Sequence, residues 1–167
     1  MSIFERSGRR IHFIHIPKCC GTSIKQMLED NDWILHPYPS VPEYLQNELH
    51  VEKKEMQSGF LNHVHRNIWS MWSMQRDYQF AIVRNPYDRI LSKIKQIRRE
   101  VGDFPLDGFL KDLFLHLNYA IPGTHSQGLG SANNHFRPQI DFIGPETCVF
   151  KMETDIDELM LDLKKEI

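Results

Sequence analysis

Apolar residues along this chain form two kinds of pattern: short continuous runs, and stretches in which they recur every three or four positions. The runs at residues 11–16 and 78–83 predict strands. The second run is almost entirely apolar, as is typical of a strand buried on both faces. The recurrence of Ile90, Ile94 and Ile97 predicts a helix over residues 87–100. The other predicted elements are helices at 24–29, 67–74, 109–117 and 156–167 and strands at 60–65 and 148–152.

Strands that alternate with helices predict an α/β domain. We expect a mainly parallel central sheet of about four strands with helices on both faces. With 167 residues, the chain is long enough for one substantial core but not for two, so residues 1–167 are expected to form a single domain.

The formal net charge of −2 gives the chain no overall attraction to nucleic acid or to a membrane, so an anion site has to be built locally. The first ten residues are polar, and no stretch approaches the roughly 18 apolar residues of a membrane span. The three cysteines do not form a disulfide framework. We therefore expect a cytoplasmic protein.

The first candidate anion site lies where the strand at residues 11–16 gives way to a helix. Lys18 provides a cation there, and Gly21 allows a close approach of the backbone. Thr22 or Ser23 is expected near the helix N-cap, where unpaired N–H groups and the helix dipole favour phosphate. The alternative is an ordinary turn with a surface lysine. A Walker A loop is a poor match, because Lys18 precedes the glycine and no first glycine is present.

The second candidate site follows the buried strand at residues 78–83. Arg84 leaves the end of that strand, which is where ligands bind in open α/β sheets. Ser92 falls on the first turns of the next helix and is placed to face back toward Arg84. A guanidinium and a hydroxyl together form a compact clamp for phosphate. The alternative assigns Arg84 and Arg89 to surface ion pairs, for instance with Asp88.

Together, the two units resemble the phosphate-binding motifs of sulfotransferases that use 3′-phosphoadenosine 5′-phosphosulfate (PAPS). FIHIPKCCGTS at residues 13–23 resembles the motif for the 5′-phosphosulfate, and FAIVRNPYDRILS at 80–92 resembles the motif for the 3′-phosphate. HFRPQ at 135–139 and DFIG at 141–144 are similar to a late segment of the branch that contains carbohydrate 2-O-sulfotransferases and small bacterial relatives. The likeness follows the same order through residues 11–153.

This resemblance implies a P-loop-like, three-layer fold. It also implies transfer of a sulfuryl group from PAPS to an acceptor hydroxyl, such as that of a sugar or a phenol. Adenosine 3′,5′-bisphosphate (PAP) would be the product, and no metal is implied. Carried over position by position, the motifs assign the 5′-phosphosulfate to Lys18, Gly21, Thr22 and Ser23, and the 3′-phosphate to Arg84 and Ser92. Lys18 would also stabilise the charge that develops on the leaving phosphate.

A hydroxyl acceptor calls for a general base, and histidine is the natural candidate near neutral pH. His63 and His65 lie between the two phosphate motifs, and the branch that the chain resembles carries its base histidine in a similar place. His63 fits that spacing slightly better, and His135 is the next candidate. His12 is expected to be structural and His15 to pack under the loop. The pair His63 and His65 has no nearby carboxylate or cysteine, so it makes a weak metal site.

Two other functions compete with sulfuryl transfer. A P-loop nucleotide kinase or NTPase is disfavoured by the missing Walker A pattern. A non-catalytic nucleotide-binding module is disfavoured by the presence of Lys18 and of the central histidines. Cys19 and Cys20 depart from the small or polar residues that many relatives carry. We expect them to be small loop residues rather than catalytic ones, at a place where thiol modification would block the loop.

Overall fold

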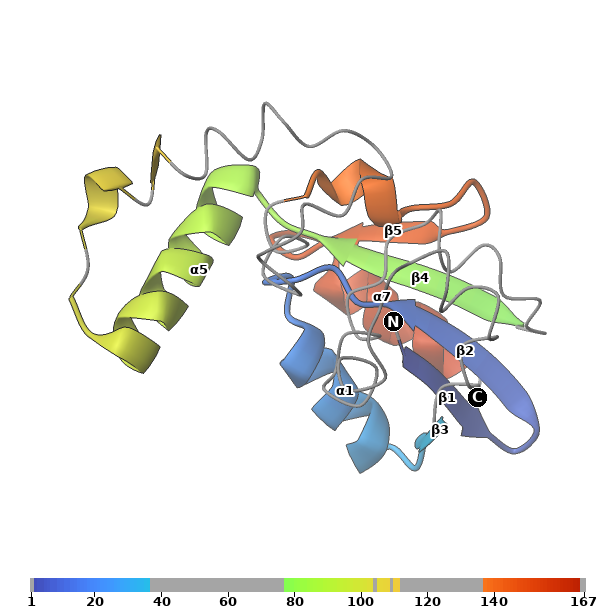
Figure 1. The fold of residues 1–167 in the computed structure, drawn as a ribbon. Helices are drawn as coiled ribbons and strands as arrows, with labels where there is room; N and C mark the ends of the chain where they lie inside the picture. Colours follow the sequence, from blue (N-terminus) through green and yellow to red (C-terminus); the bar gives the residue numbers. More distant parts are fainter. Residues whose placement is uncertain (1, 37–76, 104, 109, 112–136, 166–167) are drawn as a thin grey trace, which may run out of the picture.

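The computed structural model describes residues 2–36, 77–103, 105–108, 110–111 and 137–165 (Figure 1). These residues form a five-stranded sheet in the order β3-β1-β2-β4-β5. Its strands are β1 (Ser2–Arg6), β2 (Arg9–Ile14), β3 (Ile34–His36), β4 (Tyr78–Val83) and β5 (Cys148–Lys151). The helices are α1 (Gly21–Asp30), α5 (Pro86–Val101), the short 3-10 helix η3 (Gln139–Phe142) and α7 (Ile156–Lys165).

Several predicted elements are confirmed with small shifts of their ends. β4 has the predicted bounds, and α5 extends the predicted helix by one residue at each end. β2 begins and ends two residues earlier than the predicted strand at 11–16. The strand predicted at 60–65 and the helix at 67–74 lie outside the described residues, as does most of the helix predicted at 109–117.

The predicted α/β class is confirmed, but the prediction of a mainly parallel sheet is wrong in the part of the chain that is described. β2 pairs with β4 and β4 with β5 in parallel, but β1 pairs antiparallel with both β2 and β3. β1 and β2 form a hairpin whose turn residues Ser7 and Gly8 have φ angles of 50° and 79°. Positive φ at both turn residues matches the right-handed twist of paired strands. The sheet is therefore mixed.

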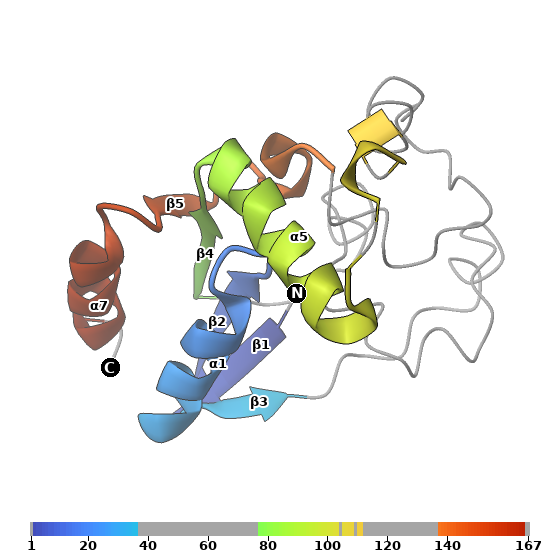
Figure 2. The ribbon, with the colours of Figure 1, turned by 90° about the vertical axis from the view of Figure 1, so that its left-hand side faces the viewer.

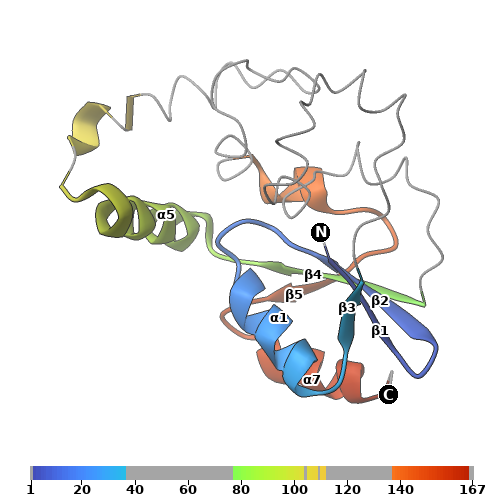
Figure 3. The same ribbon diagram turned by 60° about the horizontal axis from the view of Figure 1, so that its bottom comes forward.

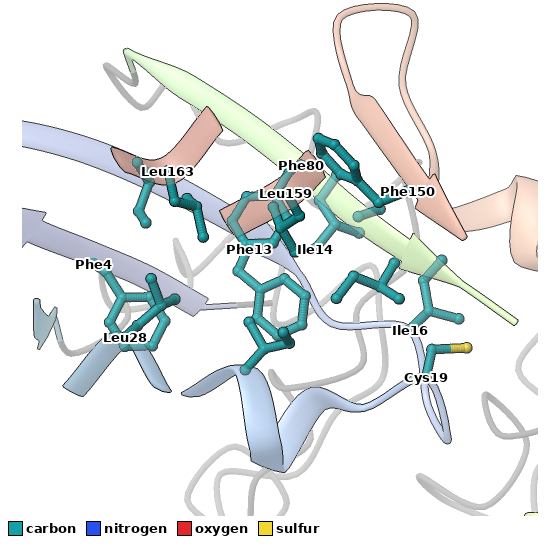
Figure 4. Packing of buried hydrophobic residues seen from close by; sticks show 14 of the residues in the cluster. Phe4, Phe13, Ile14, Ile16, Cys19, Leu28, Phe80, Phe150, Leu159 and Leu163 are labelled. Atoms are coloured by element: carbon teal, nitrogen blue, oxygen red, sulfur yellow. The ribbon is translucent and has the colours of Figure 1, made fainter. Parts of the chain in front are cut away.

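Helices α1 and α7 lie on the same face of this sheet (Figure 3). The prediction placed helices on both faces, and among the described residues these two helices share one. Side chains from both reach a single hydrophobic core, in which Leu28 of α1 lies near Phe4 and Leu159 of α7 near Phe80 (Figure 4). None of the helices in the described ranges is long and apolar enough to span a membrane.

Stacked aromatic rings join the two central strands inside this core. Phe13 of β2 is the register partner of Phe80 of β4, and their ring centroids lie 5.1 Å apart. Phe150 of β5 meets Phe80 edge-on at 6.4 Å. On the next pair in the register, buried His12 contacts Gln79 (Nδ1 to Oε1, 2.9 Å), which confirms the structural role predicted for this histidine.

The parallel pairing of β2 and β4 decides where a ligand site can form. Because both strands run in the same direction, the segments that follow them leave the sheet at the same edge. The loop between β2 and α1 therefore lies beside the start of α5 (Figure 2).

Candidate anion-binding site

Helix α1 begins earlier than the sequence predicted. The N-cap is Cys20 and the first helical residue is Gly21, whereas the sequence predicted a helix that starts at residue 24. Thr22 and Ser23 lie near the N-cap, as predicted, but they belong to the first turn of the helix and have exposed side chains. No side chain caps the helix, so the first-turn N–H groups of α1 keep their capacity to bind an anion.

The loop before α1 adopts an uncommon backbone conformation. Lys18 and Cys20 have φ angles of 66° and 59°, in the left-handed region that costs a non-glycine residue roughly 1–2 kcal/mol. Left-handed residues next to a helix start turn successive N–H groups toward a common concave side, which is a frequent geometry for binding phosphate. Strain of this kind is concentrated at ligand sites.

Gly21 is required because a histidine ring occupies the space of a side chain. A Cβ atom at Gly21 would lie 1.7 Å from Nε2 of His15. The His15 ring is itself stacked on Phe13, with centroids 5.6 Å apart. His15 thus packs under the loop, as predicted, and it supports the first turn of α1 from below.

The side chain of Lys18 reaches helix α5. Its Nζ donates a hydrogen bond to Oε1 of Gln96 at 3.1 Å. Partial burial lowers the pKa of Lys18, and the positive charges of Lys93, Arg99 and Arg84 lower it further. The loop lysine therefore lies in a region of positive electrostatic potential. An anionic ligand bound there would stabilise the charged form of the lysine.

Arg84 and Ser92 lie on the adjacent strand end and helix. Arg84 Nη1 donates to the backbone oxygen of Lys18 at 3.5 Å, so the structure brings these two predicted site residues into contact. Ser92 is partly buried on α5, one helical turn before Gln96, the partner of Lys18. The predicted residues of the two motifs thus surround one end of the sheet.

Gln139 fixes the backbone of Arg84, a role that the sequence did not reveal. Its Oε1 accepts a hydrogen bond from Arg84 N at 2.8 Å, and its Nε2 donates to Arg84 O at 2.7 Å. The same Oε1 accepts from the thiol of Cys19 at 3.3 Å. One side chain therefore joins the loop before α1 to the end of β4. The only signal in the sequence was the position of Gln139 in the late segment that resembles sulfotransferases.

Arg89 is a second residue whose role the sequence did not reveal. Its side chain is buried, with an exposed fraction of 6%, so the alternative that placed it in a surface ion pair is wrong. Nε donates to the backbone oxygen of Pro17 at 2.9 Å, and Nη1 donates to that of Arg137 at 2.8 Å. Burial lowers the pKa of Arg89, which still lies far above neutral pH because arginine is always charged in proteins.

The two cysteines have the environment of unreactive thiols. Cys19 is buried, and this burial raises its pKa to about 12. Cys20 is partly buried, which raises its pKa as well. Since the thiolate is the nucleophile, protonated thiols at this position support the expectation that neither cysteine is catalytic.

The predicted base histidines His63 and His65 lie outside the described residues, as does His135. Among the residues that are described, no group of three His, Cys, Asp or Glu side chains is arranged to hold a metal ion.

The geometry so far defines an α/β protein with a strand–loop–helix unit for binding anions. A model of the sulfotransferase family matches residues 3–160, and the chain therefore belongs to this family. It is a transferase of sulfuryl groups. Searches of curated proteins and of solved structures found no match.

The bonds of Gln139 lead to a prediction about stability. Gln139→Leu removes both partners of the Arg84 backbone and should lower the free energy of unfolding by about 1–3 kcal/mol. Gln26→Leu is a matched control, because the side chain of Gln26 donates to Asp30 on the exposed side of α1 and the loss of this bond should be close to neutral. Urea unfolding measures both. Equal losses in the two variants would contradict a special role of Gln139.

A second prediction concerns Gly21. Gly21→Ala forces the His15 ring out of its place and should cost about 1–3 kcal/mol of folding free energy. In Gly108→Ala the new methyl group meets no atom of the described residues within 4 Å, so this control should fold as well as the wild type. The comparison is again made by urea unfolding, and tolerance of both substitutions would show that His15 is free to move aside.

Proposed function

We propose that this sulfotransferase uses PAPS as its donor. The observation that carries the proposal is the contact between the two motif residues, Lys18 before α1 and Arg84 after β4. A nucleotide with a 5′-phosphosulfate and a 3′-phosphate presents two anionic groups on one ribose. The two positively charged segments at this end of the sheet suit those two groups.

In this proposal, each end of the donor has its own set of residues. The 5′-phosphosulfate lies at the first turn of α1, where backbone N–H groups point outward and the hydroxyls of Thr22 and Ser23 are exposed. The 3′-phosphate is held by the guanidinium of Arg84 and the hydroxyl of Ser92. Gly21 leaves room for the backbone and for the His15 ring beneath it.

The reaction is an in-line displacement at sulfur. The acceptor oxygen forms a bond to sulfur while the bond from sulfur to the 5′-phosphate oxygen breaks, and PAP leaves. Lys18 and the amides of α1 stabilise the negative charge that grows on the leaving phosphate. The proton of the acceptor hydroxyl goes to a histidine base, His63 or His65, with His135 as the next candidate.

In this proposal the acceptor is a compound with a hydroxyl group. The likeness to the 2-O-sulfotransferase branch supports a carbohydrate acceptor. The protein would work in the cytoplasm as one domain. A transfer assay with labelled PAPS against sugars, phenols, lipids and peptides identifies the acceptor class.

Calorimetric titrations with PAP and with ATP test which nucleotide the protein binds. A PAPS-dependent enzyme should bind PAP and discriminate against ATP, because ATP lacks the 3′-phosphate that Arg84 and Ser92 hold. Preference for ATP would move the protein to the class of nucleotide kinases and overturn the proposal.

Arg84 provides the first quantitative prediction for donor binding. Arg84→Ala should weaken PAP binding by about 1.5–3 kcal/mol, the range of a charge-assisted hydrogen bond. Arg98→Ala, an exposed arginine on α5 that belongs to neither motif, is the control and should leave PAP affinity unchanged. If Arg84→Ala binds PAP as tightly as the wild type, the assignment of the 3′-phosphate to Arg84 is wrong.

The second prediction concerns the base. His63→Ala should reduce kcat by roughly 10²–10⁴-fold, the usual contribution of a general base, and leave PAP affinity nearly intact. His65→Ala should have a smaller effect. Circular dichroism and PAP binding show whether each variant is folded. If the His65 variant is inactive and the His63 variant active, the two roles are exchanged. If both are active, His135 becomes the candidate to test.

A further inference from the structure

One polar face of helix α5 lies against the loop before α1. Arg89 bonds to Pro17 in the loop, and Gln96, two turns later on the same side of the helix, bonds to Lys18. Lys93 stands between them on that side, at the i+4 position from Arg89. Three side chains of one helix face thus line the loop.

Lys93 and Lys18 share a single acceptor. Nζ of Lys18 donates to Oε1 of Gln96 at 3.1 Å, and Nζ of Lys93 donates to the same oxygen at 3.5 Å. The acceptor is a neutral amide, so it orients both ammonium groups without neutralising either. The amide nitrogen of Gln96 donates a hydrogen bond to the carboxylate of Glu100 at 2.7 Å.

This arrangement keeps two cations close together in a partly buried place. Burial lowers the pKa of Lys93 and of Lys18, and each lysine lies near enough to Glu100 for the carboxylate to oppose this shift. Among the neighbouring charges, that of Lys93 lowers the pKa of Lys18 the most. Two like charges that converge on one oxygen repel each other, and an anion placed between them would remove the repulsion.

We propose that Lys93 is a further donor-binding residue, which contacts the 5′-phosphosulfate together with Lys18, and that Gln96 positions both lysines for it. The inference rests on the proposed function and deepens it. The 5′ end of the donor is favoured over the 3′ end because Lys93 shares its acceptor with Lys18, the lysine of the loop, whereas Arg84 contacts only the backbone of that lysine.

The test compares two nucleotides that differ only at the 5′ position, PAP and adenosine 3′-monophosphate. Lys93→Met keeps the aliphatic stem and removes the charge. It should weaken PAP binding about tenfold and change the affinity for adenosine 3′-monophosphate by less than about twofold. Lys95→Met removes an exposed lysine from another side of the same helix and should change neither affinity.

Gln96→Glu provides a second variant, which keeps an acceptor oxygen for both lysines but loses the hydrogen bond that Gln96 Nε2 donates to Glu100. Its carboxylate occupies the place of the amide and competes with the donor for the two ammonium groups. PAP affinity should therefore fall by at least as much as in Lys93→Met, and binding of adenosine 3′-monophosphate should persist.

Each possible outcome has a separate meaning. If the wild type fails to bind PAP, the proposed donor is wrong. If the wild type binds PAP but Lys93→Met binds it equally well, the role of Lys93 is overturned while the donor assignment stands. Equal weakening of PAP and adenosine 3′-monophosphate would place Lys93 at the 3′-phosphate and also overturn the inference.

Discussion

The parallel pairing of β2 with β4 is the constraint on which the site depends. Stacking of Phe13 on Phe80 fixes the register of these strands in the core. With the register fixed, the chain leaves both strands at the same edge of the sheet. The loop that carries Lys18 and the segment that carries Arg84 then become neighbours, although 66 residues separate them in the sequence.

Beyond the ends of these strands, hydrogen bonds of polar side chains hold the segments together, whereas apolar packing does so inside the core. Arg89 and Gln139 bond to backbone groups of segments that are 72, 55 and 48 residues away from them. A loop that carries partly buried backbone groups needs partners for them, and here two side chains supply these partners. They are side chains with several donors or acceptors in a fixed geometry, which allows each to hold two segments at once. The site is therefore positioned by hydrogen bonds to the backbone.

The sequence predicted the parts of the fold that depend on local pattern. β4 is almost entirely apolar, and α5 has a clear helical recurrence, so both were found with nearly the right bounds. β1 was missed because its residues, SIFER, mix apolar with charged positions and its pairing depends on a hairpin turn. The start of α1 was placed too late because the cap is made by a left-handed cysteine, a conformation that no propensity favours.

Candidate residues were predictable to the extent that they belong to short motifs. Lys18 and Arg84 stood out through their places after strands, and the structure brings them into contact. The role of Arg89 was not predictable, because an arginine in a sequence most often lies on the surface. Whether it bonds to a distant carbonyl depends on tertiary contacts. The same holds for Gln139, whose partners are in two other segments.

The amides at two central places serve different chemical needs. Gln139 accepts hydrogen bonds from Arg84 N and from the thiol of Cys19 and donates one to Arg84 O, so a carboxylate, which only accepts, would leave Arg84 O without this partner. Gln96 accepts from Lys18 and Lys93 and donates to Glu100, and because its amide is neutral it orients both ammonium groups without cancelling their charge. In the proposed donor complex an anion would relieve the repulsion between these two cations, and this relief would contribute to the affinity for the donor.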